Sequence, residues 1–347
     1  MKRVVAFLRR RWLLLLILVG FLIFVIIQGR DIEALGVTLV RGQWEWLLVA
    51  TGVQALYYFL YAIQYEFGFA TVEVQSNWVD LVPVVFASIF VTTVVPSGGV
   101  SSLALFVDDA ARRGQSPVRA AEGSLLVLVA DLATMVPLIA YAMLYLAERG
   151  VLEIYQMLGV ALYVAFSASL AGVILLGRWL PGVLHAAFVW AQENINWLAS
   201  LAGRPPLLPL GWADRQAKDY IEAARHISDH PRALGWTLAI AFVVHLVGAL
   251  TLFFIFLAYG QPASPGAVIS AFVFDVVFSV VAFVPQGLGI AESVIALVLI
   301  SLGIPVGAAL AITVVFRGFS VWLPLLIGFL LLRQVRTFGG KGPSRGG

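Results

Sequence analysis

Eight long apolar segments limit what this chain can fold into. Each has about the 20 residues, or more, that an α-helix needs to cross the hydrocarbon core of a bilayer. Backbone amides and carbonyls in lipid must be satisfied within the protein, so the segments are expected to be helices. The 347 residues are 61% hydrophobic and 12% charged, which excludes an ordinary soluble domain. The sequence therefore predicts an all-α polytopic membrane protein. The segments cover residues 12–28, 44–66, 81–107, 119–146, 157–180, 234–259, 268–302 and 306–332.

Two of these segments contain residues that end helices. Segment 81–107 is interrupted by Pro-Ser-Gly-Gly at Pro96, and segment 268–302 by Pro-Gln-Gly-Leu-Gly at Pro285. If both crossed the membrane in full, two basic connections would lie outside, against the preference of Lys and Arg for the cytoplasmic side. Treating each as a re-entrant hairpin places every basic connection inside. We therefore predict six spanning helices and two re-entrant broken-helix hairpins in the cell (plasma) membrane, with both termini cytoplasmic.

The connector at residues 181–232 is expected to be amphipathic and cytoplasmic. Its first part, "VLHAAFVWAQENINWLASL", places Leu184 and Phe188 near one helical face, and Trp190 and Trp197 suit the level of the lipid headgroups. A more polar helix follows and stops before a proline. Residues 1–335 are predicted to form a single membrane domain, and the glycine-rich residues 336–347 a flexible tail.

The two interrupted segments belong to an internal repeat. An offset of 189 residues places Pro96 on Pro285, Gly98 on Gly287 and Gly114 on Gly303. The order of spans is preserved, with one repeat at about 12–147 and the other at about 157–332. Because one hairpin is expected to enter from the cytoplasm and the other from outside, the repeats would be inverted, as in many transporters. The alternative is a chance match within a small apolar alphabet.

The two helix breaks are the first candidate binding site. The second limb of each hairpin would present free amides and the positive end of a helix dipole, which attract anions such as phosphate. Glycine lets a ligand approach the backbone closely. The alternative is a tight turn that only packs the hairpin. The candidate substrate-binding residues at the breaks are Ser97, Gly98, Gly99, Gln286, Gly287 and Gly289.

Charged residues within the spans are the second candidate. Asp131 and Arg317 lie in the middle of apolar helices, where a charge costs several kcal/mol unless it is paired or hydrated. The offset places Arg317 on Leu128, one turn from Asp131, so both are expected to face a shared cavity, paired with each other or with Glu292. The alternative is a structural ion pair that locks the bundle. Weaker candidates are Asp275, Glu122 and His245, the last expected to be a hydrogen-bonded core histidine.

Two stretches resemble the membrane domain of lysylphosphatidylglycerol synthases. They are "VVPSGGVSSLALFVDDAARRGQSPVRAAEGSLLVLVADL" and "FVPQGLGIAESVIALVLISLGIPVGAALAITVVFRG". The first departs from the commonest form of the family, because Ser101 and Ser102 stand where an acidic residue is frequent. The resemblance covers most of the chain and implies a flippase-like domain. The chain ends at Gly347, so a stand-alone member without the synthase domain is expected.

The resemblance implies a non-enzymatic lipid translocator. A phosphate-bearing headgroup, from a membrane phospholipid or a lipid-linked glycan, would bind between the hairpins. Arg317 would hold the anion, and Asp131 and Glu292 would balance charge or carry a coupled cation or proton. The alternative is a scaffold or accessory subunit for a partner synthase or glycosyltransferase. No cofactor, metal or nucleic-acid partner is expected, and the chain has no cysteine and no Walker A loop.

Overall fold

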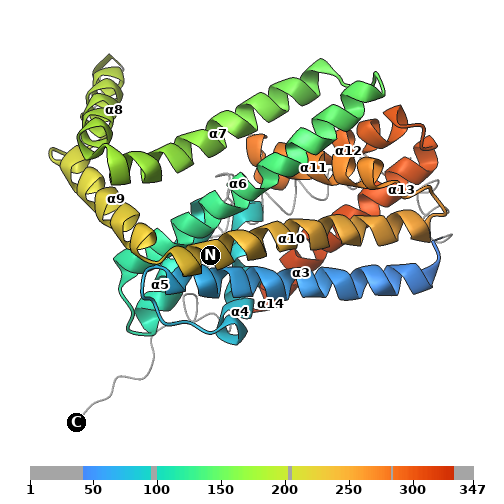
Figure 1. Cartoon of the computed structure of the whole chain (residues 1–347), viewed down its shortest axis with the longest axis horizontal. Helices are drawn as coiled ribbons and strands as arrows, with labels where there is room; N and C mark the ends of the chain where they lie inside the picture. The colour runs from blue at the N-terminus through green and yellow to red at the C-terminus, as the bar shows by residue number, and fades with distance from the viewer. Residues whose placement is uncertain (1–41, 95–99, 202–204, 283, 332–347) are drawn as a thin grey trace, which may run out of the picture.

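The computed structural model describes residues 42–94, 100–201, 205–282 and 284–331, and every regular element in these ranges is helical (Figure 1). The predicted span at 12–28 and the tail at 336–347 lie outside them. The helices are α3 (Trp44–Ala70), α4 (Trp78–Val94), α5 (Val100–Arg112), α6 (Pro117–Glu148), α7 (Ile154–Trp179), α8 (Pro181–Leu201), α9 (Trp212–Asp229), α10 (Pro231–Ala258), α11 (Pro265–Val281), η2 (Pro285–Gly287), α12 (Ile290–Ser301), α13 (Val306–Arg317), η3 (Gly318–Trp322) and α14 (Leu323–Leu331).

Five helical runs in the described ranges are long and apolar enough to cross a membrane. They are α3, α6, α7, α10 and the continuous run α13–η3–α14. These match five of the six predicted spans, and the sixth falls on residues 12–28. Serine or proline starts several of them: the Ser116 side chain accepts a hydrogen bond from the Arg119 amide at the start of α6, and Pro117 occupies the first helical position. The polytopic, all-helical prediction is confirmed at this level.

Both interrupted segments consist of two shorter helices, as the sequence predicted. The first interrupted segment is α4–α5, and the second is α11–η2–α12. In the second, the chain leaves α11 and makes one 3-10 turn, in which Gln286 and Gly287 have positive φ angles of 51° and 64°. Gly289 follows with φ 83° and precedes α12. A side chain at Gly287 would lie 2.8 Å from the Phe278 carbonyl oxygen, so both conformation and space require glycine there.

The helix boundaries repeat along the chain. At the offset of 189 residues, the starts of α4, α5 and α6 fall within two residues of the starts of α11, α12 and α13. The turns before α6 and α13 are also alike: Gly114 and Gly303 have φ angles of 78° and 89°, and the following amides of Gln115 and Ile304 both bond back to a carbonyl five residues earlier. The repeat is therefore present in local structure as well as in sequence.

The long helices pack into one bundle with the two interrupted segments toward opposite ends. α3 and α10 run side by side along most of their length, and the Gln43 amide donates to the Ala258 carbonyl at 2.9 Å. Figure 1 shows α4 and α5 toward the end of the bundle where α9 lies, and α11 and α12 toward the other end. The 3-10 turn η2 reaches far enough to pack against α4.

The connector forms two helices that extend from the bundle (Figure 1). Phe188 of α8 packs on Trp212 and Tyr220 of α9, and Leu184 is buried. The predicted apolar face of α8 thus covers α9 in part, while Trp190 and Trp197 on the same helix are largely exposed. The interfacial position expected for these two indoles therefore stays a prediction.

Candidate functional site

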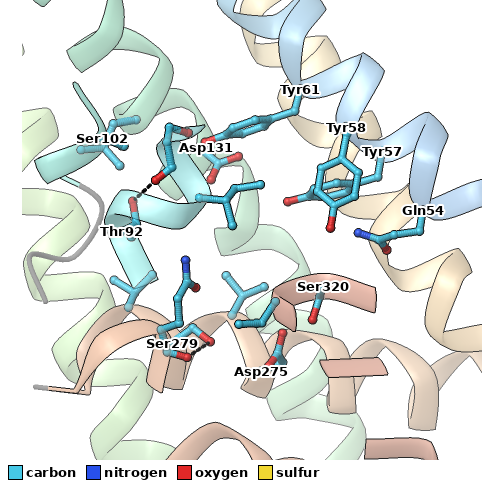
Figure 2. A pocket seen from close by; sticks show the side chains of 18 of the residues that line it. Gln54, Tyr57, Tyr58, Tyr61, Thr92, Ser102, Asp131, Asp275, Ser279 and Ser320 are labelled. Carbon is cyan, nitrogen blue, oxygen red and sulfur yellow. Dashed lines mark hydrogen bonds between the residues drawn. The ribbon is translucent and has the colours of Figure 1, made fainter. Parts of the chain in front are cut away.

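A cavity of about 220 Å³ lies inside the bundle, between α3, α6 and the two interrupted segments. Its walls come from both halves of the repeat, and many of the lining side chains are polar although the surrounding helices are apolar. Figure 2 shows these polar groups pointing into one space from opposite sides. The polar lining comprises Gln54, Tyr57, Tyr58, Tyr61, Tyr65, Ser88, Thr92, Ser102, Asp131, Asp275, Ser279, Gln286, Arg317 and Ser320.

One wall is a row of tyrosines on α3. Tyr57, Tyr58, Tyr61 and Tyr65 recur at helical spacing and line the cavity. Figure 2 shows the first three on the same side of it. The Tyr58 hydroxyl donates to the Phe319 carbonyl at 2.8 Å, which ties α3 to the π-helical turn η3. These tyrosines are not among the site residues predicted from the sequence. The sequence pattern that could have identified them is four tyrosines on one face of an otherwise apolar span.

Arg317 forms the centre of the opposite wall. Only 2% of its side chain is exposed, and it donates four hydrogen bonds. Its Nε bonds the Glu292 carboxylate at 2.8 Å, Nη1 bonds Asp275 at 2.9 Å and Ser279 at 3.2 Å, and Nη2 bonds the Gln286 carbonyl at 2.7 Å. The planar guanidinium suits such a fan of acceptors. Arg317 therefore fastens α13 to both limbs and the break of the second interrupted segment.

The helix that carries Arg317 changes geometry immediately after it. Residues Gly318–Trp322 form a π-helical turn between α13 and α14. Such turns are rare and occur frequently at functional sites. The turn brings Ser320 to the cavity, where its buried hydroxyl oxygen has no hydrogen-bond partner within the described ranges.

Glu292 joins the ion cluster to the helix break. One carboxylate oxygen accepts from Arg317, and the other accepts from the Gly289 amide at 2.7 Å, at the start of α12. The sequence predicted free amides at this break. Instead, the Gly289 amide is bonded to Glu292 and the Gly287 amide to the Val284 carbonyl at 3.0 Å. These two amides are occupied within the protein because the carboxylate and the turn cap them.

Asp131 faces the same cavity as Arg317 but is not paired with it. Arg317 was expected to pair with either Asp131 or Glu292. In the structure it bonds Glu292 and also Asp275. Asp131 lies instead beside His245 of α10, whose Nε2 is 3.6 Å from Asp131 Oδ1 and 2.9 Å from the Asp131 carbonyl oxygen. The expectation that His245 is a hydrogen-bonded core residue is confirmed. Asp275, ranked low from sequence, is the second partner of Arg317.

The other predicted residues divide into two sets. At the second break, Gln286 lines the cavity and Gly287 is buried. At the first break, Ser97, Gly98 and Gly99 lie outside the described residues. Within the described ranges, no group of three or more His, Asp or Glu side chains is placed to hold a metal ion.

Two comparisons with known proteins identify the family of this chain. The sequence profile of the family described as lysylphosphatidylglycerol synthase TM region matches residues 12–328. The UPF0104 membrane protein PH1989 of Pyrococcus horikoshii is 21% identical over 338 residues, which cover 93% of this chain and 97% of that protein. With its five described apolar spans, the chain belongs to the lysylphosphatidylglycerol synthase TM region family and is a multi-pass membrane protein.

Proposed function

We propose that this protein binds a lipid headgroup in the central cavity and moves it between the two leaflets, without an enzymatic step. The observation that carries the proposal is a polar cavity, lined by an interrupted helix, in an otherwise apolar bundle. Non-helical backbone at membrane depth is tolerated only where it is buried in protein or lines a wet cavity.

The repeat supports alternating access as the mechanism. The two interrupted segments lie toward opposite ends of the bundle in Figure 1, and η2 packs against α4. This is the arrangement expected of two hairpins that enter from opposite sides and meet near the midplane. We propose that six spans and the two hairpins form an inverted repeat in the plasma membrane with both termini cytoplasmic, and that the two halves rock about the cavity.

The lining suggests how a headgroup would be held. The hydroxyls of Tyr57, Tyr61 and Tyr65 and the amide of Gln54 offer both donors and acceptors. Gln54 is 3% exposed, and its Oε1 has no hydrogen-bond partner among the described residues. Arg317 already faces two carboxylates, so it would organise the second break rather than supply a free cation. The proposed substrate is a phosphate-bearing lipid, either a phospholipid or a lipid-linked glycan.

Lipid movement in reconstituted vesicles tests the proposal. Fluorescent analogues of phosphatidylglycerol, phosphatidylethanolamine and a polyprenyl-phosphate sugar would be placed in separate liposomes, and a membrane-impermeant quencher would report the fraction in the outer leaflet. We expect one lipid class to move faster than in protein-free vesicles. Tyr61→Phe should slow it, whereas Tyr141→Phe, which removes a hydroxyl from an exposed position on α6, should not. No acceleration for any of the three lipids would refute the proposal.

A scaffold role is the second candidate, because α8 and α9 extend from the bundle and expose Trp190 and Trp197. Such a surface could recruit a synthase or glycosyltransferase. Replacing both tryptophans with serine would separate the two functions. If the double variant loses a co-purifying enzyme but moves lipid at the wild-type rate, the tryptophans recruit a partner and the cavity moves lipid independently of it.

A further inference from the structure

Asp131 is a carboxylate in the cavity wall with no Arg or Lys partner in the described part of the chain. It lies in the middle of α6, and its Oδ1 is buried without a hydrogen-bond partner among those residues. Two acidic side chains of the second interrupted segment, Asp275 and Glu292, are both held by Arg317. Asp131 therefore differs from them in having no fixed counter-charge.

The groups around Asp131 offer protons rather than fixed positive charge. His245 from α10 has its Nε2 2.9 Å from the Asp131 carbonyl oxygen. Because a carbonyl only accepts, Nε2 must carry a hydrogen, and the same atom lies 3.6 Å from Oδ1. From α3, Gln64 lies beside the carboxylate, fully buried, with neither amide atom in hydrogen-bond geometry. Tyr61 extends toward Asp131 in Figure 2.

The remaining neighbours complete this environment. Tyr57 and Tyr65 of α3 line the cavity with Asp131, and the hydroxyl of Tyr163 on α7 donates to the carbonyl of the next residue, Leu132, at 3.3 Å. Asp275 faces the same cavity from α11. Among the described lining residues, Arg317 is the one Arg or Lys, and Asp275 and Glu292 already bond it. If Asp275 and Glu292 are both ionised, Arg317 balances only one of their two negative charges. An ionised Asp131 would then add a second negative charge without a counter-ion.

A proton is the ligand that fits this site. An unpaired charge at membrane depth costs several kcal/mol, and a single proton on one oxygen lone pair removes it. A metal cation would need several oxygen ligands, and the described residues contain no group of three acidic or histidine side chains placed for one. The phenol and imidazole groups beside the carboxylate can pass a proton to cavity water.

We propose that Asp131 binds a proton from water on one side of the membrane and releases it on the other, so that lipid translocation is coupled to proton movement. The coupling rests on the proposed function. In each cycle one O–H bond forms at the Asp131 carboxylate when the cavity is open to one side and breaks when it is open to the other. The bond from His245 to the backbone carbonyl of Asp131 holds α10 against α6 beside this carboxylate.

Infrared difference spectroscopy of the protein in lipid tests the proton site without any transported lipid. A pH titration of the wild-type protein should show a carboxyl C=O stretch that appears and disappears reversibly. Asp131→Asn should lose this band, and Asp131→Glu, which serves if the first variant does not fold, should restore one with a shifted midpoint. Glu148→Gln removes an exposed carboxylate at the end of the same helix and should leave the band unchanged. A band that persists in Asp131→Asn would overturn the proposal, as would a band displaced by sodium rather than by protons.

Lipid movement under an imposed pH gradient tests the coupling. The wild-type rate should differ between the two gradient directions, and in Asp131→Asn this difference should disappear while movement in Glu148→Gln keeps it. Wild-type lipid movement that ignores the gradient would overturn the coupling and leave the proposed function intact. Absence of any lipid movement would refute the proposed function, and the infrared titration would still decide whether Asp131 binds a proton.

Discussion

Replacing Arg317 with methionine should strongly destabilise the protein, because it leaves Asp275 and Glu292 buried without their shared counter-ion. Methionine keeps a long, unbranched side chain, so the change mainly removes charge and four hydrogen bonds. Removing one partner of a buried ion pair costs about 3–5 kcal/mol. This figure already includes the hydrogen bonds of the pair, so the value of about 1.5–3 kcal/mol for one hydrogen bond to a charged group is not added to it. We therefore expect about 3–5 kcal/mol of lost unfolding free energy.

Unfolding by SDS in mixed micelles, followed by tryptophan fluorescence, measures this loss. Arg149→Met removes an exposed arginine at the end of α6 that lies over the Tyr145 ring, and it should change the unfolding free energy by less than about 1 kcal/mol. The triple variant Arg317→Met, Asp275→Asn, Glu292→Gln should recover part of the loss, because neutral side chains no longer need a counter-ion. If Arg317→Met is as stable as Arg149→Met, or if the triple variant is no better than the single one, the cluster does not hold the second interrupted segment.

Three further changes test the break and the cavity wall. Gly287→Ala should cost about 1–3 kcal/mol of stability, because it adds a steric conflict with the Phe278 carbonyl to a strained φ. Gly289→Ala, which has open space around it, should cost only about 1 kcal/mol. Thermal unfolding of the two variants measures this difference. Glu292→Gln should be less destabilising than Glu292→Ala in the same measurement, since the glutamine oxygen can still accept from the Gly289 amide. Tyr61→Phe should slow lipid movement while shifting the unfolding free energy by under about 0.5 kcal/mol, and a slowed rate that accompanies a large stability loss would mean that the hydroxyl is structural.

The elements that the sequence predicted correctly are those with a local cause. Apolar length specified the five described spans, and proline with glycine marked both interruptions, because these residues act on the backbone where they stand. The repeat was also visible, since an offset compares residues without knowing their contacts. The offset also paired Gly114 with Gly303, where the structure has matching turns.

The site was predicted less well because its contacts join distant segments. Arg317 lies 42 residues from Asp275 and 25 from Glu292, and nothing in the sequence says which carboxylate it meets. Asp275 could have been ranked higher from the sequence, because it is a carboxylate in the first limb of an interrupted helix. The amides of the second break were expected to be free, but Glu292 three residues after Gly289 is placed to cap that amide, a pairing that the spacing could have suggested.

The two halves of the repeat share their geometry but not their chemistry, and this difference bears on how such a protein could move. At the offset of 189 residues, Arg317 corresponds to Leu128 and Asp131 to Ser320, and all four positions line the same cavity. Duplicating the ion cluster would bury a second set of charges at a cost of several kcal/mol. In the described residues, the Arg317 cluster fastens α11, η2 and α13 together, whereas Asp131 in the other half has no Arg or Lys partner there. The half that contains Arg317 would then move as a rigid body. In the half that contains Asp131, binding of a single proton would change the charge and hence the packing.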